Sequence, residues 1–191
     1  MMKTVFLDRD GVLNPLISKS EELISPQNME EYRLFSGVEE SIRRLKESGY
    51  RILVITNQPD VEKGWRELDF EKLSEINKFL IQKGVDKVYS CTHGPIGDKE
   101  DKHYSECGSI VTCDCRKPQP GLLEKADRDH EINFSKSYLI GDNETDIESA
   151  KAFEANQDVS FAGKLLIGGK QIVVEQSFDN FNQATDYILR D

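Results

Sequence analysis

The most informative run of residues in this chain, close to its N-terminus, is Val5-Phe6-Leu7-Asp8-Arg9-Asp10-Gly11-Val12. Its apolar first half is typical of a buried strand, and two carboxylates one residue apart follow, then a glycine. A strand that runs into an Asp-Gly turn places both carboxylates at its carboxyl end, where open α/β sheets bind their ligands. Taken alone, the motif also fits a solvated turn, and the motifs further along the chain distinguish this turn from a ligand-binding site.

Size and composition favour one globular domain, residues 1–191. Hydrophobic residues make up 37% and charged residues 31% of the chain. The net charge of −10 argues against nucleic acid or an anionic membrane as a partner, but it allows a small phosphorylated metabolite. No apolar run is long enough to cross a membrane, and Asp8 and Asp10 would interrupt a signal peptide. We therefore expect a cytoplasmic protein.

Strand-like and helix-like segments alternate along the chain, which predicts a doubly wound, Rossmann-like parallel sheet with helices on both faces. Strands are expected at 3–7, 51–55, 85–90 and 137–140, with edge strands at 165–167 and 172–174. Helices are expected at 36–48, 69–83, 122–129, 145–153 and 180–189. Ser36-Gly37-Val38-Glu39 has the pattern of a capping box that opens the first of these helices.

Each predicted core strand is followed by polar residues. In a doubly wound sheet the carboxyl ends of the strands meet at one crevice, so these residues are expected to converge there. They comprise carboxylates, a hydroxyl, an amide and two cations, in the groups Asp8 and Asp10, Thr56-Asn57-Gln58, Arg116-Lys117-Pro118, and Gly141-Asp142-Asn143-Glu144-Thr145-Asp146.

This set of groups suits phosphoryl transfer through an aspartyl phosphate. A carboxylate can attack phosphorus, but its charge repels the phosphate, so a divalent cation is needed; hard oxygen ligands such as Asp8 and Asp142 suit Mg²⁺. Lys117 and Thr56 can bind the phosphoryl oxygens, where charge develops in the transition state. Asp10 can protonate the leaving alcohol and later deprotonate the attacking water.

The ordered motifs D-R-D-G-V-L, T-N-Q, R-K-P-x-P-G and G-D-N-x-x-D resemble those of the haloacid dehalogenase-like phosphatases. The resemblance covers the chain from about Asp8 to Asp146. It implies Asp8 as the nucleophile and Asp10 as the acid and base. It also implies phosphate or substrate contacts from four residues. Mg²⁺ would be bound by Asp8, Asp142 and the Asp10 carbonyl, and Asp146 would support these ligands without binding the metal itself. The four contact residues are Thr56, Asn57, Arg116 and Lys117.

A second motif lies in the segment that holds all four cysteines. Cys91-Thr92-His93 and Cys113-Asp114-Cys115 offer three sulfurs and one nitrogen, a ligand set that suits a tetrahedral Zn²⁺ site in a loop over 91–115. We favour Cys91, His93, Cys113 and Cys115 as the ligands. Cys107 or His103 could replace His93, and disulfides or unconnected thiols are the other interpretations.

A zinc loop that ends in C-D-C-R-K-P resembles subfamily III of this family. That branch includes the D-glycero-D-manno-heptose 1,7-bisphosphate and histidinol phosphate phosphatases. The resemblance implies a structural zinc and a capless enzyme. The chain departs from the heptose pattern at Lys63, where an arginine is usual, at Asn143, where a cation is frequent, and in 15–31, which lacks Gly-Tyr-Val. These departures concern the substrate and leave the phosphoryl-transfer residues in place.

Three functions therefore compete. The first is a Mg²⁺-dependent phosphomonoesterase that acts on heptose 1,7-bisphosphate or a related sugar phosphate. The second is the same chemistry on histidinol phosphate. The third is a non-catalytic, zinc-organised binding module, which is disfavoured because every charged catalytic position is filled. We expect a monomer.

Overall fold

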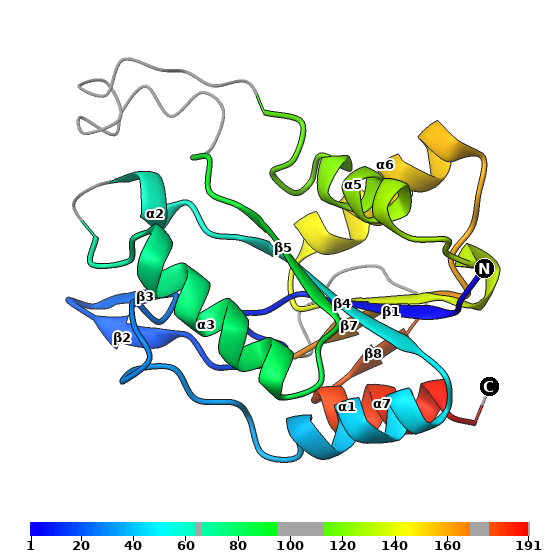
Figure 1. Cartoon of the computed structure of the whole chain (residues 1–191), viewed down its shortest axis with the longest axis horizontal. Coiled ribbons are helices and arrows are strands. Elements are labelled where there is room, and N and C mark those ends of the chain that lie inside the picture. The colour runs from blue at the N-terminus through cyan, green and yellow to red at the C-terminus, as the bar shows by residue number, and fades with distance from the viewer. Residues whose placement is uncertain (64–65, 95–112, 169–175, 191) are drawn as a thin grey trace.

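The computed structural model describes residues 1–63, 66–94, 113–168 and 176–190. Its centre is a six-stranded parallel sheet with strand order β5-β4-β1-β6-β7-β8 (Figure 1). The strands are β1 (Thr4–Leu7), β4 (Arg51–Asn57), β5 (Lys87–Cys91), β6 (Tyr138–Gly141), β7 (Gly163–Ile167) and β8 (Gln176–Phe178). None of the helices in the described ranges is long and apolar enough to cross a membrane.

Helices cover both faces of this sheet, as Figure 1 shows. One face carries α1 (Val38–Glu47), α3 (Phe70–Gln82) and α7 (Phe181–Ile188), and the other carries α5 (Gly121–Asp129) and α6 (Glu144–Gln157). Two short helical segments, α2 (Asp60–Lys63) and η1 (Phe134–Lys136), lie in connections. The predicted doubly wound parallel sheet is confirmed.

Strand β1 is buried on both faces and divides the core into two regions. Val5 and Leu7 pack with the apolar sides of α1, α3 and α7, whereas Phe6 points to the α5 and α6 side. There the ring of Phe6 stacks on Phe134 and meets Phe161 edge-on. This alternation follows from the two-residue period of a strand. Residues Phe6 and Asp8 are two positions apart, so the pattern directs both toward the same side of the sheet.

The site follows from the strand order. β1 lies between β4 and β6, with Leu7 in register with Val54 and Ile140. The chain builds β4 and β5 on one side of β1 and then crosses to build β6 on the other. The sheet therefore has its topological switch point beside β1, where open α/β sheets place their ligand crevice.

A small antiparallel hairpin, β2 (Ile17–Lys19) and β3 (Glu22–Ile24), lies in a segment where the sequence predicts no strand. Its turn residues, Ser20 and Glu21, both have positive φ, at 52° and 68°. Such turns usually carry Asn-Gly or Asp-Gly, so the sequence gives little sign of this one. The hairpin and α2 lie at the carboxyl ends of the strands, and between β1 and α1 the described chain forms no larger cap (Figure 1).

Two local predictions need correction or fall outside the described residues. Helix α1 has no capping box: its N-cap is Gly37, with φ 83° and no side-chain hydrogen bond. The glycine is suited to this left-handed conformation, which a serine cap would not adopt. The edge strand predicted at 172–174 lies outside the described residues, and the last strand of the described sheet is β8.

Candidate active site

The predicted catalytic residues line one cavity of about 350 Å³ at the carboxyl ends of β1, β4 and β6. Asp8 follows β1, Thr56 and Asn57 end β4, and Asp142 follows β6. The hairpin contributes its flanking residues Leu16 and Ser25 to the wall. The remaining lining residues are Asp10, Arg116, Lys117, Asn143, Thr145 and Asp146. All eight residues predicted for phosphoryl transfer therefore lie together, although they come from four separate segments of the chain.

Lys117 is the buried centre of the site. Its Nζ donates to Asp8 Oδ1 at 2.7 Å, to Asp146 Oδ1 at 2.6 Å and to the Ile55 carbonyl at 2.9 Å. Burial alone would lower the pKa of Lys117, but the carboxylates of Asp146 and Asp8 outweigh it and raise that pKa. The side chain therefore keeps its positive charge beside the position of the predicted nucleophile.

Asn57 connects β4 to the Lys117 backbone. Its Oδ1 accepts from the Lys117 N–H at 3.0 Å, and its Nδ2 donates to the Lys117 carbonyl at 3.1 Å. These paired hydrogen bonds give Asn57 a role in orienting Lys117. Direct contact between Asn57 and substrate, which the motif implies, stays a prediction.

The Asp8 carboxyl group is almost fully buried, with 9% of the residue exposed. Burial raises its pKa to about 7; Lys117 opposes this rise, and the neighbouring charge of Asp146 adds to it. Two buried carboxylates share one ammonium group here, so the local charge is negative unless a proton or a cation is added. This is the charge state expected of a cation-binding site.

Asp10 accepts hydrogen bonds on both carboxylate oxygens. Asn14 Nδ2 donates to Oδ1 at 2.8 Å, while Ser25 Oγ and Gln58 Nε2 donate to Oδ2 at 2.9 Å and 2.7 Å. Arg9 forms an ion pair with Oδ2 at 2.8 Å. Burial alone would raise the pKa of Asp10, but the Arg9 guanidinium and the other donors outweigh it and lower the pKa.

The acidic groups on the β6 side fit a hard cation. Carboxylate oxygens of Asp8, Asp142 and Asp146 lie within 4.8 Å of one another. Asp146 accepts from Lys117 on Oδ1 and from the Asn143 N–H on Oδ2, in a capping box that begins α6. Its oxygens are therefore engaged in supporting the site. Asp8, which also accepts from Lys117, and Asp142 offer further carboxylate oxygens at the strand ends, the ligand type that suits a magnesium ion.

Glycine at position 11 allows Asp142 to approach β1. Gly11 has φ +89°, and a Cβ there would overlap Oδ2 of Asp142. Gly141 has the same role for Asp146, because a Cβ at Gly141 would overlap the side chain of Asp146. Both motif glycines are therefore required by close approach of a carboxylate, in addition to the turn that Gly11 makes.

The predicted zinc ligands also come together. Cys91 Sγ lies 3.2 Å from Cys115 Sγ and 3.8 Å from Cys113 Sγ, and His93 Nδ1 lies 3.3 Å from Cys115 Sγ. A zinc–sulfur distance of ~2.3 Å places the corners of a tetrahedral site ~3.8 Å apart, so this cluster has about the required size. The alternatives Cys107 and His103 lie outside the described residues, as does most of the predicted loop.

The Cys/His cluster is linked to the catalytic cavity through its own backbone. The His93 carbonyl accepts from Arg116 Nη1 at 3.1 Å, and Arg116 lines the cavity. On the other side, the Asp114 carbonyl accepts from the N–H of Gly121 at 2.9 Å, at the start of α5. A Cβ at Gly121 would overlap that carbonyl, so the glycine allows the loop to pack on the helix.

Arg9, Gln58, Asn14 and Ser25 were not predicted as site residues, yet all four contact the Asp10 carboxylate. Arg9 and Gln58 stand within the quoted motifs, and the signal for Arg9 is a basic residue between the two motif aspartates, two positions after the end of the apolar strand β1. Asn14 and Ser25 give no comparable signal. Ser25 reaches Asp10 only because the hairpin folds back over the strand ends.

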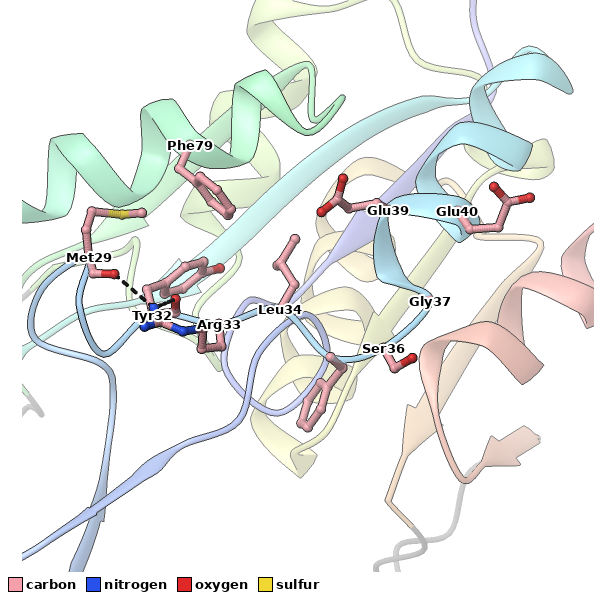
Figure 2. A pocket seen from close by; sticks show the side chains of 10 residues that line it. Met29, Tyr32, Arg33, Leu34, Ser36, Gly37, Glu39, Glu40 and Phe79 are labelled. Atoms are coloured by element: carbon pink, nitrogen blue, oxygen red, sulfur yellow. Dashed lines mark hydrogen bonds between the residues drawn. The ribbon is translucent and has the colours of Figure 1, made fainter.

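A larger cavity, about 610 Å³, lies elsewhere, between α3 and the segment that leads into α1. Figure 2 shows it with Tyr32 and Phe79 on one side and Glu39 and Glu40 on the other. Its described lining holds no group of strand-end carboxylates. We therefore assign the catalytic site to the smaller cavity, where the acidic cluster and Lys117 are found.

Comparison with known proteins agrees with this assignment. The family described as polynucleotide kinase 3 phosphatase matches residues 3–168. The D-glycero-beta-D-manno-heptose-1,7-bisphosphate 7-phosphatase of Salmonella typhi is 32% identical over 189 residues, which is 97% of this chain and 88% of that protein. The enzyme of the same name from Escherichia coli K12 is 33% identical over 190 residues, covering 97% and 87%.

Among solved structures, the D,D-heptose 1,7-bisphosphate phosphatase from B. bronchiseptica, complexed with magnesium and phosphate, aligns with a TM-score of 0.73. The alignment covers 99% of both chains at 22% identity, so it is evidence for the shared fold alone. With the family match across most of the chain and curated relatives above 30% identity along nearly all of it, this chain belongs to the haloacid dehalogenase-like phosphatases, in the family described as polynucleotide kinase 3 phosphatase.

Proposed function

We propose that this protein is a Mg²⁺-dependent phosphomonoesterase that hydrolyses D-glycero-D-manno-heptose 1,7-bisphosphate, or a related sugar phosphate, through an aspartyl phosphate at Asp8. One observation carries the proposal. The Asp8 carboxylate lies at the end of the central strand, held by Lys117, in a cavity that Thr56 and Asp142 also line. The names and near full-length similarity of the curated relatives support the choice of substrate.

In the first step, an Asp8 oxygen attacks phosphorus and the bond to the sugar oxygen breaks. Lys117 balances charge on the phosphoryl oxygens, where the transition state concentrates it. The Thr56 Oγ1 accepts from Gln58 at 2.8 Å, so its own hydroxyl hydrogen can be donated to a phosphoryl oxygen. Asp10 gives a proton to the leaving alkoxide, which departs as the alcohol.

In the second step, water attacks the phosphorus of the aspartyl phosphate. Asp10, now ionised, takes a proton from this water, and the bond from phosphorus to Asp8 breaks. Inorganic phosphate leaves, and both carboxylates return to their starting states. The lowered pKa of Asp10 favours the ionised form that this second step needs. The first step uses the protonated form, which the same shift in pKa disfavours in the free protein.

Asp8, Asp142 and the Asp10 carbonyl are the groups we assign to magnesium. The donor set fits, since the side-chain members are hard oxygens that lie close together and carry excess negative charge. When bound, magnesium screens the repulsion between the attacking carboxylate and the phosphoryl group.

Zinc is assigned to Cys91, His93, Cys113 and Cys115, whose ligand atoms lie within 4.8 Å of one another. Burial raises the pKa of the Cys91 and Cys115 thiols, so a cation is needed to hold them as thiolates. We assign this zinc a structural role: bound by these four residues, it would hold the His93 carbonyl in place, and this carbonyl accepts from Arg116 at the cavity wall.

The dimensions of the cavity favour a small metabolite. Ligand cavities in proteins run from about 300 to 1,000 Å³, and this one has 350 Å³. Arg116 offers a guanidinium for a second phosphate or for sugar hydroxyls, and Leu16 gives an apolar patch on the opposite segment. We propose that the protein does this work as a monomer.

Phosphate release from the purified protein with Mg²⁺ tests the proposal. The panel is heptose 1,7-bisphosphate, histidinol phosphate and several sugar monophosphates, with Asp8→Asn as the inactive control. Preference for the bisphosphate supports the full proposal. Preference for histidinol phosphate or a monophosphate keeps the chemistry and overturns the substrate. Absence of turnover on every compound, with both metals bound, favours a non-catalytic binding module instead.

A further inference from the structure

Arg9 is buried in an unusual way. Its side chain is 0% exposed, whereas arginine is almost never fully buried unless it is paired. The guanidinium faces Asp10: Nε lies 3.2 Å and Nη2 3.1 Å from Oδ1, and Nη2 lies 2.8 Å from Oδ2. The motif thus places a buried cation between its two carboxylates, directed at the second one.

Gln58 holds the other side of this ion pair. Its Oε1 accepts from Arg9 Nη2 at 2.6 Å, and its Nε2 donates to Asp10 Oδ2 and to Thr56 Oγ1. Within the described residues of the chain, Arg9 is the only cation in contact with Asp10. The neutral donors Asn14 and Ser25 complete the shell around the carboxylate.

The guanidinium of Arg9 also contacts an aromatic ring, that of Tyr32. Arg9 Cζ lies 5.8 Å from the centroid of the Tyr32 ring, a cation–π distance, and only 2% of Tyr32 is exposed. The same ring lines the larger cavity, where Phe79 meets it edge-on (Figure 2). Arg9 is therefore fixed by Gln58 at one edge and by Tyr32 at its face, which gives its fork a defined orientation.

We propose that Arg9 is a positioning residue that acts through Asp10. It fixes the carboxylate in the orientation in which this group exchanges a proton with the leaving alcohol and with the attacking water. The inference rests on the proposed function, because it assigns Arg9 a role in that reaction. A planar fork with several N–H donors can hold both oxygens of a carboxylate, which a lysine ammonium cannot do.

The test is a double-mutant cycle of Arg9→Lys and Asp10→Asn, followed by turnover of p-nitrophenyl phosphate and of an alkyl sugar phosphate. General acid–base catalysis contributes ~10²–10⁴-fold, so loss of its orientation should cost roughly tenfold to a hundredfold. With Asp10 present, Arg9→Lys should lower turnover by this factor. In the Asp10→Asn background it should have no further effect, because the group it positions is already gone.

The leaving group provides a second readout. p-Nitrophenol leaves without a proton, so formation of the aspartyl phosphate should be spared in Arg9→Lys while its hydrolysis slows. We expect a burst of about one p-nitrophenol per active site followed by slow turnover, and a larger loss on the alkyl ester in the first step. Arg43→Lys, an exposed arginine of α1, is the matched control and should behave as wild type.

If Arg9→Lys does not fold, Arg9→Gln takes its place, since its neutral amide keeps one hydrogen-bond donor for Asp10 and removes the second arm of the fork. Equal losses with and without Asp10, or no loss in either, would overturn this inference and leave the phosphatase assignment intact. A wild-type protein without turnover on any ester would overturn both.

Discussion

Lys117 Nζ lies 2.7 Å from Asp8 Oδ1, although the two residues are 109 positions apart in the chain. The sheet brings them together: Asp8 ends the central strand, and Asn57, at the end of the neighbouring strand, holds the Lys117 backbone through two hydrogen bonds. Asp146 accepts from the same ammonium group at 2.6 Å. The nucleophile, its cation and the second carboxylate therefore form one buried unit.

Removal of the cation should damage both stability and activity. In Lys117→Met two buried carboxylates lose their partner, and breaking a buried ion pair costs about 3–5 kcal/mol. Urea unfolding of the metal-free protein at neutral pH measures this loss. Turnover should fall at least ~10²–10³-fold, the usual loss when a group that stabilises the transition-state charge is removed.

Lys151→Met, at an exposed position of α6, is the matched control and should unfold within about 0.5 kcal/mol of wild type, as surface substitutions usually do. An unchanged unfolding free energy in Lys117→Met would contradict the buried unit described here.

Magnesium binding should release a proton at mildly acidic pH. The pKa of Asp8 is raised to about 7 in the metal-free fold, from an ordinary value of 3.8, so the folded state holds a proton that the unfolded state has lost between these values. The contribution of Asp8 to stability therefore falls as pH rises from about 4 to 7. A cation bound to Asp8 favours the ionised carboxylate, so it opposes the fall in stability that otherwise accompanies the rise in pH.

Calorimetric titration with MgCl₂, in buffers of different ionisation enthalpy, counts the protons. We expect nearly one proton per magnesium at about pH 6 and close to none at about pH 8.5, with affinity rising over the same range. Binding that releases no proton at either pH would show that magnesium does not act on a protonated Asp8.

Gly11→Ala should weaken magnesium binding by moving Asp142. Gly11 and Gly168 share a φ of +89°, but only at Gly11 does an added Cβ meet a neighbour, the Asp142 carboxylate; at Gly168 nothing lies within 4 Å. Gly168→Ala therefore reproduces the backbone strain of about 1–2 kcal/mol without the overlap. Both variants should lose comparable backbone stability, and only Gly11→Ala should lose magnesium affinity. Equal affinities in the two variants would remove Asp142 from the metal site.

Cys113→Ser should lose zinc and become less stable, because the affinity for a structural metal contributes directly to the folding free energy. Cys107→Ser is the matched control and should keep one zinc per chain, since our ligand set leaves Cys107 out. Metal analysis measures both, and cobalt substitution reports the number of thiolate ligands through its sulfur-to-metal absorption. Zinc retained in Cys113→Ser, or lost in Cys107→Ser, would mean that the ligand set is wrong.

The sequence predicts the strand-end chemistry well because each motif is local. Asp8, Thr56 and Asp142 each follow an apolar run, and the parallel order of the strands then brings them together. Cys91 and Cys115 converge for the same reason: Cys91 ends β5, and Cys115 leads into the residues before α5.

Other features depend on contacts that no local pattern records. Arg9 is buried because Gln58, 49 residues further along, and Tyr32 complete its surroundings. The hairpin forms although Ser20 and Glu21 are poor residues for a left-handed turn, and it is the hairpin that brings Ser25 to Asp10. These are tertiary contacts, so only the folded chain reveals them.

The most direct test of the account is to trap the phosphorylated enzyme. Asp10→Asn, which lacks the base for the second step, is mixed with p-nitrophenyl phosphate and Mg²⁺, quenched in acid and digested. The account predicts a phosphoryl group on the peptide that contains Asp8, removable by hydroxylamine, with wild type showing less and Asp8→Asn none. Turnover by the wild type with no phosphoryl group on that peptide in any variant, or with the group on another residue, would contradict it.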